Sequence, residues 1–237
     1  MLLTRVIPTP VDSIDTAAPA ARDWIAAAYA PLSGSFVRLN MITSLTGSAA
    51  GADGTSDSLT SPVDRMVLGA VRAASDVVVV GAQTVRAEGY IVPRRTRLAI
   101  VTTSGRLDGH RLQLDEETAS RVVVVCPADR EDRVRMEVSS LGLDVLPVAA
   151  AGDLAPADIV AALASRGWHR VVCEGGPTLA SRFAAAGVID EYCVTVAPTI
   201  GPVGAPFITV PDEVRLRTEG LLVDGAGFSY LRLRPHA

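Results

Sequence analysis

The sequence predicts an α/β protein with one mostly parallel sheet and an antiparallel hairpin near the C-terminus. From residue 36 onward, short apolar runs alternate with helical segments, which is typical of such sheets. Aromatic residues make up only 4% of the chain, and Ala and Val carry the apolar content, as suits strands covered by helices on both faces. Two final apolar segments flank Asp224-Gly225, a pattern that indicates a hairpin.

Residues 1–34 are predicted to be an N-terminal extension made of a loop and a helix. Pro8 and Pro10 indicate the loop. The Ala-rich segment 16–30 predicts the helix, and Pro31 ends it because proline cannot continue a helical ladder.

Residues 35–237 are predicted to form the main domain. The apolar run 36–42 predicts a buried strand, and the stretch 43–60, rich in Gly, Ser, Thr and Asp, predicts a loop. A helix over 61–74 is expected, with Ser61 as N-cap and Pro62 at the first helical position. The other expected strands are 76–80, 97–102, 121–126, 144–147, 168–173, 191–197, 214–222 and 228–233, and the other expected helices are 131–141, 157–166 and 177–186.

Charge and composition argue against several classes of function. A net charge of −4 disfavours a general nucleic-acid or membrane-surface protein. No apolar run approaches the roughly 18–20 residues that a spanning helix needs, and no signal-peptide core follows Arg5. We therefore expect a cytoplasmic protein with neither nucleic-acid nor membrane partners. The three cysteines stand singly in apolar runs, which predicts reduced buried thiols, and the three histidines lack metal-ligand spacing, so no metal is expected.

The most informative segment is Cys173–Leu179, which follows a buried strand and opens a helix. Gly175-Gly176 permits a tight turn with exposed N–H groups, Pro177 suits the first helical turn, and Thr178 adds a hydroxyl. Such a helix N-terminus can accept a phosphate. The alternative is an ordinary strand-to-helix turn whose glycines serve steric needs only. Glu174 favours a ligand site, because ligands bind at the carboxyl ends of strands in open α/β sheets.

A second turn, Gly81–Tyr90, follows the valine run 77–80 and combines residue types in the same way. Gly81, Thr84 and Glu88 again lie beyond the carboxyl end of a strand. Two such turns would frame one cofactor, whereas the alternative for this segment alone is a short capped helix.

Together these motifs resemble the reductase domain of bacterial riboflavin biosynthesis, in the dihydrofolate-reductase-like superfamily. The matching segments are Gly81-Ala-Gln-Thr84 with Arg86-Ala-Glu88, Glu174-Gly-Gly-Pro-Thr-Leu179, Ala186-Gly-Val-Ile-Asp190-Glu191, Val196-Ala-Pro198 with Gly201, and Leu39 to Gly47. The resemblance runs from about Phe36 to Leu233 in the same order and spacing, and the Val-Arg-Ala-Glu-Gly-Tyr variant is similar to the actinobacterial branch.

The resemblance implies a three-layer sandwich that binds NADPH at the carboxyl edge of the sheet and transfers hydride to C1′ of a phosphoribosylamino-uracil. The implied cofactor contacts are Ile42, Ser58, Thr84, Glu88 and the loop from Gly175 and Gly176 through Pro177, Thr178 and Leu179 to Ser181. The implied substrate contacts are Ser56, Arg72 and Glu174, with Arg94 or Arg95 on the phosphate. For Arg72, the alternative is a solvated surface charge.

Preference for NADPH requires donors for its 2′-phosphate. Ser104 and Arg106, in the turn after the strand that ends near Thr102, supply a hydroxyl and a guanidinium. Hydride transfer also needs a proton source, for which Glu174 and Glu88 are the nearest carboxyl candidates, beside a bound water or a substrate group.

Two departures from the family leave the substrate open. Thr46 stands where the family has Asp, and Glu88 replaces the Asp of the family turn, without the Asn/Asp-Pro that follows it. The alternatives are therefore a pterin reductase acting on a substrate such as dihydrofolate, or a pyridine-nucleotide-binding protein without turnover. A homodimer is expected, since an edge of the terminal hairpin offers a surface for strand pairing.

Overall fold

The computed structural model describes residues 1–30, 33–150 and 153–236. Its strands are β1 (Leu2–Ile7), β2 (Asp12–Asp15), β3 (Phe36–Ser44), β4 (Val77–Gly81), β5 (Arg97–Val101), β6 (Val122–Pro127), β7 (Asp144–Val148), β8 (Arg170–Gly175), β9 (Glu191–Ala197), β10 (Leu216–Asp224) and β11 (Ser229–Pro235). Its helices are α1 (Ala21–Ala28), α2 (Pro62–Ala73), α3 (Ala82–Ala87), α4 (Glu116–Ala119), α5 (Glu131–Val138), α6 (Pro156–Ser165) and α7 (Pro177–Ala185), with 3₁₀ turns η1 (Ala128–Arg130) and η2 (Ser139–Leu141).

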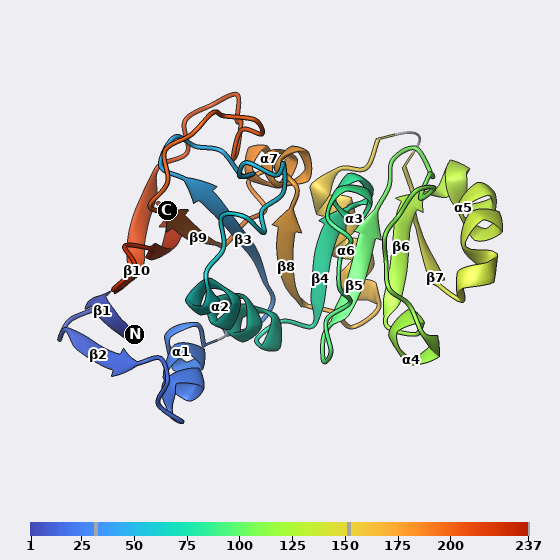
Figure 1. Ribbon diagram of the computed structural model, residues 1–237. Helices are drawn as coiled ribbons and strands as arrows, with labels where there is room; N and C mark the ends of the chain where they lie inside the picture. Colours follow the sequence, from blue (N-terminus) through green and yellow to red (C-terminus); the bar gives the residue numbers. More distant parts are fainter. Residues whose placement is uncertain (31–32, 151–152, 237) are drawn as a thin grey trace.

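These strands form one sheet, in the order β2-β1-β10-β11-β9-β3-β8-β4-β5-β6-β7 (Figure 1). Every neighbouring pair from β9 to β7 is parallel. The pairs from β2 to β9 are antiparallel. The predicted mostly parallel sheet with an antiparallel C-terminal hairpin is therefore confirmed.

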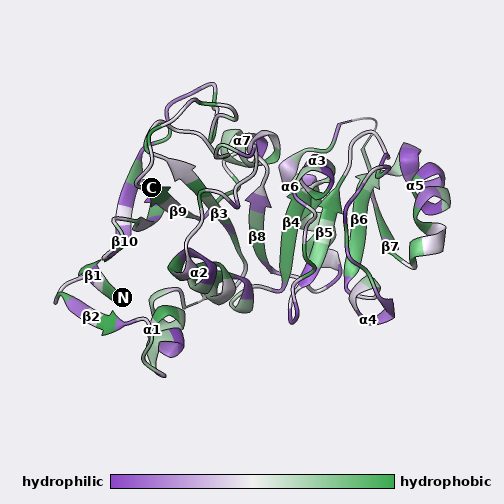
Figure 2. Ribbon diagram, in the orientation of Figure 1, coloured by the Kyte–Doolittle hydropathy of each residue, from purple (hydrophilic) through white to green (hydrophobic). Residues whose placement is uncertain are grey.

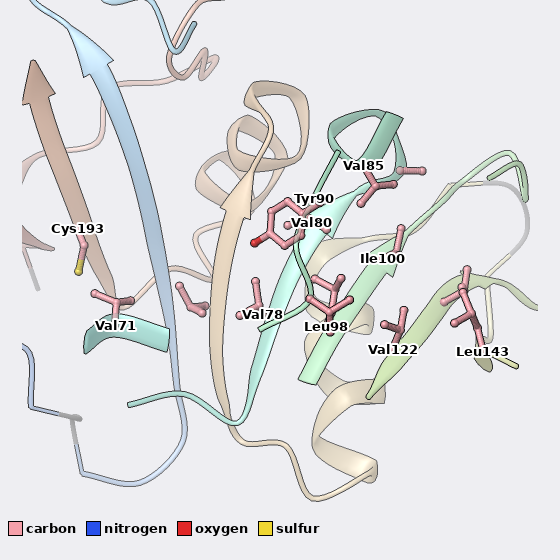
Figure 3. Packing of buried hydrophobic residues seen from close by; sticks show 14 of the residues in the cluster. Val71, Val78, Val80, Val85, Tyr90, Leu98, Ile100, Val122, Leu143 and Cys193 are labelled. Carbon is pink, nitrogen blue, oxygen red and sulfur yellow. The ribbon is translucent and has the colours of Figure 1, made fainter. Parts of the chain in front are cut away.

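Helices cover both faces of this sheet and make three layers. Because side chains alternate along a strand, Val78 and Val80 belong to the core cluster that includes residues of helices α1 to α5, while Val77 and Val79 belong to the cluster that includes residues of α6 and α7. Figure 3 shows the first of these clusters, and Figure 2 shows hydrophobic residues following β4, β5 and β6. The valine-rich strands are thus buried from both sides, as the sequence predicts.

The N-terminal extension contains two strands that the sequence analysis missed. The residues around Pro8 and Pro10 form the connection, but β1 and β2 flank it. Strand β1 pairs antiparallel with β10, Leu3 opposite Asp224. Local patterns do not reveal this pairing, because the partner lies at the far end of the chain. The expected open edge on the terminal hairpin is wrong, since β1 covers β10 and β2 is the edge strand. The boundary at residue 34 stays a prediction.

Most other expected elements agree with the structure, with shifted ends. The N-cap prediction is confirmed, as the Ser61 side chain accepts a hydrogen bond from the Asp64 backbone N–H at 3.0 Å. The first helix begins only at Ala21, the hairpin strands lie one or two residues later than expected, and α4 was not predicted. Helix α3 lies where a short capped helix was the alternative, but no side chain caps it. The expected end of the first helix at Pro31 falls outside the described residues.

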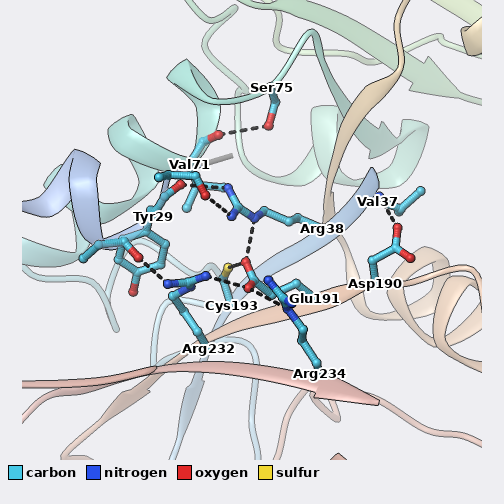
Figure 4. A network of polar contacts seen from close by, with 12 residues as sticks. Tyr29, Val37, Arg38, Val71, Ser75, Asp190, Glu191, Cys193, Arg232 and Arg234 are labelled. Atoms are coloured by element: carbon cyan, nitrogen blue, oxygen red, sulfur yellow. Dashed lines mark hydrogen bonds and ion pairs between the residues drawn. The ribbon is translucent and has the colours of Figure 1, made fainter. Parts of the chain in front are cut away.

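A buried ionic network fixes α1 to the sheet (Figure 4). Arg38 and Glu191 are fully buried, and Arg38 Nε donates to Glu191 Oε2 at 2.7 Å. Glu191 Oε1 also accepts from Arg232 and Arg234. The two Nη groups of Arg38 donate to carbonyls of Tyr29 and Ala30, just beyond the C-terminal end of α1, where the helix dipole favours a cation. Burial raises the pKa of the Glu191 carboxyl, but Arg232 and Arg38 outweigh it and leave the pKa below its ordinary value.

The three cysteines, Cys126, Cys173 and Cys193, are buried free thiols, as expected. Within the described residues, none of the helices has the length and apolar character needed to cross a bilayer. The same residues contain no group of three or more His, Cys, Asp or Glu side chains arranged to hold a metal ion.

Candidate active site

The two glycine-containing turns meet at the carboxyl edge of neighbouring parallel strands. Strand β4 ends at Gly81 and runs into α3, and β8 ends at Gly175 and runs into α7. The backbone N–H of Gly176 donates to Thr84 Oγ1 at 2.6 Å, so the turns are in direct contact. The expectation that both turns lie at one edge of the sheet is confirmed.

The turn after β8 has little room for side chains. Gly175 has φ of +90°, a region that favours glycine, and its peptide bond to Gly176 is cis. A Cβ on Gly176 would lie 3.1 Å from Thr84 Oγ1, and one on Gly175 would lie 3.2 Å from Met41 Sδ. The turn therefore presents backbone in place of side chains.

Helix α7 starts at this turn with free backbone donors. No side chain caps its N-terminus, and Pro177 at its first position has no N–H. The N–H groups of Thr178 and Leu179 belong to the first turn, which has no acceptor within the helix. These donors, together with the helix dipole, favour an anion such as a diphosphate.

Glu174 and Arg72 form an ion pair beside the turn. Arg72 Nε donates to Glu174 Oε1 at 2.7 Å, and Arg72 Nη2 donates to Oε2 at 2.6 Å. The Glu174 side chain is 7% exposed, so this pair is shielded from water on most sides. Burial lowers the pKa of Arg72, but the Glu174 charge outweighs it and raises the pKa overall. The alternative of a solvated surface charge is therefore wrong for Arg72.

Tyr90 completes this pair, and the sequence analysis assigned it no role. Its hydroxyl donates to Glu174 Oε2 and accepts from Arg72 Nη2 at 2.6 Å. Figure 3 shows its ring near Val80, in the core cluster between the sheet and α2. The contact depends on the path of the chain between α3 and β5, which no local pattern reveals.

Glu88 and Ser56 join the loop before α2 to the end of α3. The Ser56 backbone N–H and hydroxyl donate to the two Glu88 oxygens at 3.3 Å and 3.2 Å. Ser58, which was expected to contact the cofactor, donates its hydroxyl to Asp53 at 2.5 Å. Glu88 is exposed, so its carboxylate remains in contact with solvent.

Ser104 and Arg106 lie beyond the carboxyl end of β5, the strand next to β4. Both are exposed, but Arg106 already pairs with Asp108, at 3.0 Å and 2.7 Å. Arg86 of α3 donates to the carbonyls of Arg106 and Asp108 and so attaches this turn to the cluster.

The remaining predicted residues are placed differently. Ile42 is buried in a small apolar cluster with Leu59 at the end of β3. Arg94 and Arg95 are exposed just before β5, and within the described part of the chain neither makes a polar contact with Arg72 or Glu174. Thr46 donates to the Gly201 carbonyl at 2.8 Å and ties two loops together.

Comparisons with known proteins identify the family and agree with the fold. Residues 35–229 match the family model described as RibD C-terminal domain. The chain is 33% identical over 170 residues to the riboflavin biosynthesis protein RibD of Mycobacterium tuberculosis (strain CDC 1551 / Oshkosh), a match that covers 72% of this chain and 43% of that protein. The chain thus spans less than half the length of the curated relatives it matches.

Two solved structures show the same architecture. A pyrimidine reductase-like protein from Corynebacterium diphtheriae superposes with a TM-score of 0.72 at 23% identity, over 86% of this chain and 92% of that chain. Acinetobacter baumannii RibD superposes with a TM-score of 0.68 at 26% identity, over 86% of this chain and 58% of that chain. The predicted α/β class, with a mostly parallel mixed sheet and a C-terminal antiparallel hairpin, is confirmed, and these structures share the fold.

Proposed function

The chain belongs to the RibD C-terminal domain family, and we propose that it is an NADPH-dependent reductase of riboflavin biosynthesis. Its substrate in this proposal is a 5-amino-6-(5-phosphoribosylamino)uracil-like compound, and hydride is transferred to C1′ of the ribose unit. The contact between the Gly176 N–H and Thr84 Oγ1 carries the proposal, because it joins the two glycine turns into one cofactor cradle.

The residues present fit a pyridine nucleotide. Its diphosphate would lie against the N–H groups of Thr178 and Leu179, where Gly175 and Gly176 leave space for close approach of the backbone. Ser104 and Arg106 would hold the 2′-phosphate. When bound, NADPH supplies the hydride, and the protein supplies orientation and electrostatics.

The chain's own carboxylates have different surroundings. Both oxygens of Glu174 already accept hydrogen bonds, three in all, so Glu174 orients the substrate together with Arg72. Glu88 is exposed and faces Ser56. We therefore assign proton exchange with solvent to Glu88.

One assay tests the proposal and both alternatives. NADPH absorbance is followed with the deaminated pyrimidine phosphate and, in the same buffer, with dihydrofolate. We expect oxidation with the pyrimidine only. Oxidation with dihydrofolate alone would identify a pterin reductase, and NADPH binding without oxidation in either case would identify a nucleotide-binding protein without turnover.

A side chain added to the turn after β8 tests the cofactor cradle. A Cβ at position 176 meets Thr84 Oγ1, so Gly176→Ala should raise the NADPH dissociation constant about tenfold, the equivalent of about 1.4 kcal/mol. Gly69→Ala is the control, because a Cβ there meets nothing within 4 Å. Equal NADPH affinity in both variants, measured by fluorescence titration, would remove the cradle from the proposed site.

We also propose a cytoplasmic homodimer. Free buried thiols suit a reducing compartment. The hairpin edge does not support the dimer, but Leu45, Ile200 and Val203 expose apolar side chains on adjoining loops. Sedimentation velocity measures the mass of the particle, and a monomer at micromolar concentration would contradict the dimer.

A further inference from the structure

Tyr90 contacts both members of the Arg72–Glu174 pair at once. Its hydroxyl lies between Glu174 Oε2, to which it donates, and Arg72 Nη2, from which it accepts. The Arg72 guanidinium also lies over the Tyr90 ring, 5.3 Å from Cζ to the ring centroid, which is a cation–π contact.

The segment that carries Tyr90 also fixes the backbone of Arg72. Thr96, six residues further along and 4% exposed, donates its hydroxyl to the Arg72 carbonyl at 2.8 Å. Arg72 is therefore held at its backbone and at its side chain by the single segment between α3 and β5.

Tyr90 is a permanent donor in this position. It is 8% exposed, and burial, followed by the charge of Glu174, raises its pKa well above the ordinary value. A hydroxyl that stays protonated at every pH of use donates without interruption to the carboxylate beside it.

We propose that Tyr90 is a positioning residue of the substrate site, whose hydroxyl and ring hold Arg72 and Glu174 in one fixed arrangement and thereby set the affinity for the substrate. This inference rests on the proposed function. In a site built to hydrogen-bond its ligand, a carboxylate and a guanidinium that are free to rotate must be ordered at each binding event, which weakens binding. Tyr90 removes that cost in advance.

The substitution Tyr90→Phe tests the role, because it keeps the buried ring and the contact with the guanidinium and removes only the hydroxyl. We expect the KM for the pyrimidine substrate to rise about tenfold, because both hydrogen bonds of the hydroxyl, to Arg72 and to Glu174, are lost and the two charged side chains are then ordered only when substrate binds. The change in kcat should be smaller, and the NADPH dissociation constant should stay within about twofold, since the Tyr90 hydroxyl bonds to Arg72 and Glu174, whereas Gly176 and Thr84 make the contact that joins the two turns.

Tyr230→Phe is the matched control. Tyr230 is 1% exposed, and its hydroxyl donates to another carboxylate, Asp224, at 2.8 Å. Both variants should lose comparable stability in urea, but only Tyr90→Phe should change the KM. An unchanged KM in Tyr90→Phe, or equal increases in the KM and the NADPH dissociation constant, would overturn the positioning role.

The proposed function is judged on the wild-type protein alone, by its NADPH oxidation. If the wild type does not turn over, calorimetric titration with the pyrimidine phosphate still decides the role of Tyr90. Binding that weakens about tenfold in Tyr90→Phe supports the role without catalysis, and a wild type that binds no pyrimidine overturns both proposals.

Discussion

The Arg106 guanidinium, which is proposed to bind the 2′-phosphate, already has a partner in the Asp108 carboxylate. The two side chains are 56% and 57% exposed. The hydrogen bond from Arg106 lowers the pKa of the Asp108 carboxyl. Exposed pairs of this kind contribute little to stability, because water and salt screen them. We therefore expect a phosphate with two negative charges to displace Asp108 from the guanidinium.

From this pairing we expect opposite effects of two substitutions on NADPH selectivity. Arg106→Ala should weaken NADPH binding about tenfold and leave NADH binding unchanged, because only NADPH has the 2′-phosphate. Asp108→Asn should tighten NADPH binding by about threefold, since it frees the guanidinium. Fluorescence titration with both nucleotides measures the ratio. Arg215→Ala is the control, as Arg215 is exposed and pairs with a carboxylate two residues away. A ratio that stays constant in Arg106→Ala would place the phosphate elsewhere.

Among the elements, those buried on both faces could be predicted from the sequence. The run 76–80 is apolar at nearly every position, so its burial needs no knowledge of its partners. Strand β1 was missed because it is mostly half-buried and because it is extended through its pairing with β10, at the opposite end of the chain. Helix α3 has only six residues and no side-chain cap, so it carries little local signal.

The candidate site also contains residues that could be predicted from the sequence and residues that could not. Glycine, proline and acidic residues directly after a strand identified both turns, because local geometry demands those residue types. Tyr90 and Asp108 were not identified. Their partners lie on other elements or depend on the conformation of a turn, and only the folded chain brings them together.

The network around Glu191 couples four elements, β3, β9, β11 and the C-terminal end of α1. Replacing Glu191 with Gln leaves the fully buried Arg38 without its counter-charge. Breaking a buried pair in this way costs about 3–5 kcal/mol. We expect Glu191→Gln to lower the free energy of unfolding at pH 7 by that amount, as measured by urea denaturation. Asp144→Asn, in an exposed pair with Arg166, should cost less than about 1 kcal/mol.

The same network predicts a pH dependence. The pKa of Glu191 is lower in the folded chain than in the unfolded chain, so its contribution to stability is complete above the unfolded value of about 4.3 and is lost as the pH falls through the folded value. The difference in stability between the wild type and Glu191→Gln should therefore be constant from pH 7 to pH 6 and narrow below about pH 4. A difference that does not vary with pH would show that folding leaves the pKa of Glu191 unchanged.

At the scale of the whole molecule, the N-terminal extension packs against the main domain. Leu3, Ile25 and Tyr29 are at most 1% exposed and belong to the same core cluster as the strands of the main domain. The extension also covers the β10 edge and supplies the carbonyls that accept from Arg38. These contacts make it part of the core, although the family model begins only at residue 35.

Deleting residues 1–30 should therefore destabilise the main domain and expose the β10 edge. We expect a lower urea midpoint and self-association detected by light scattering, because an uncovered strand pairs with another chain. Two point variants measure the packing contribution alone: Leu3→Ala should cost about 2–5 kcal/mol, whereas Leu2→Ala, at a position that is 56% exposed, should cost little. A truncated chain with unchanged stability and no association would mean that the extension is an appendage, and the boundary at residue 34 would then separate two independent parts.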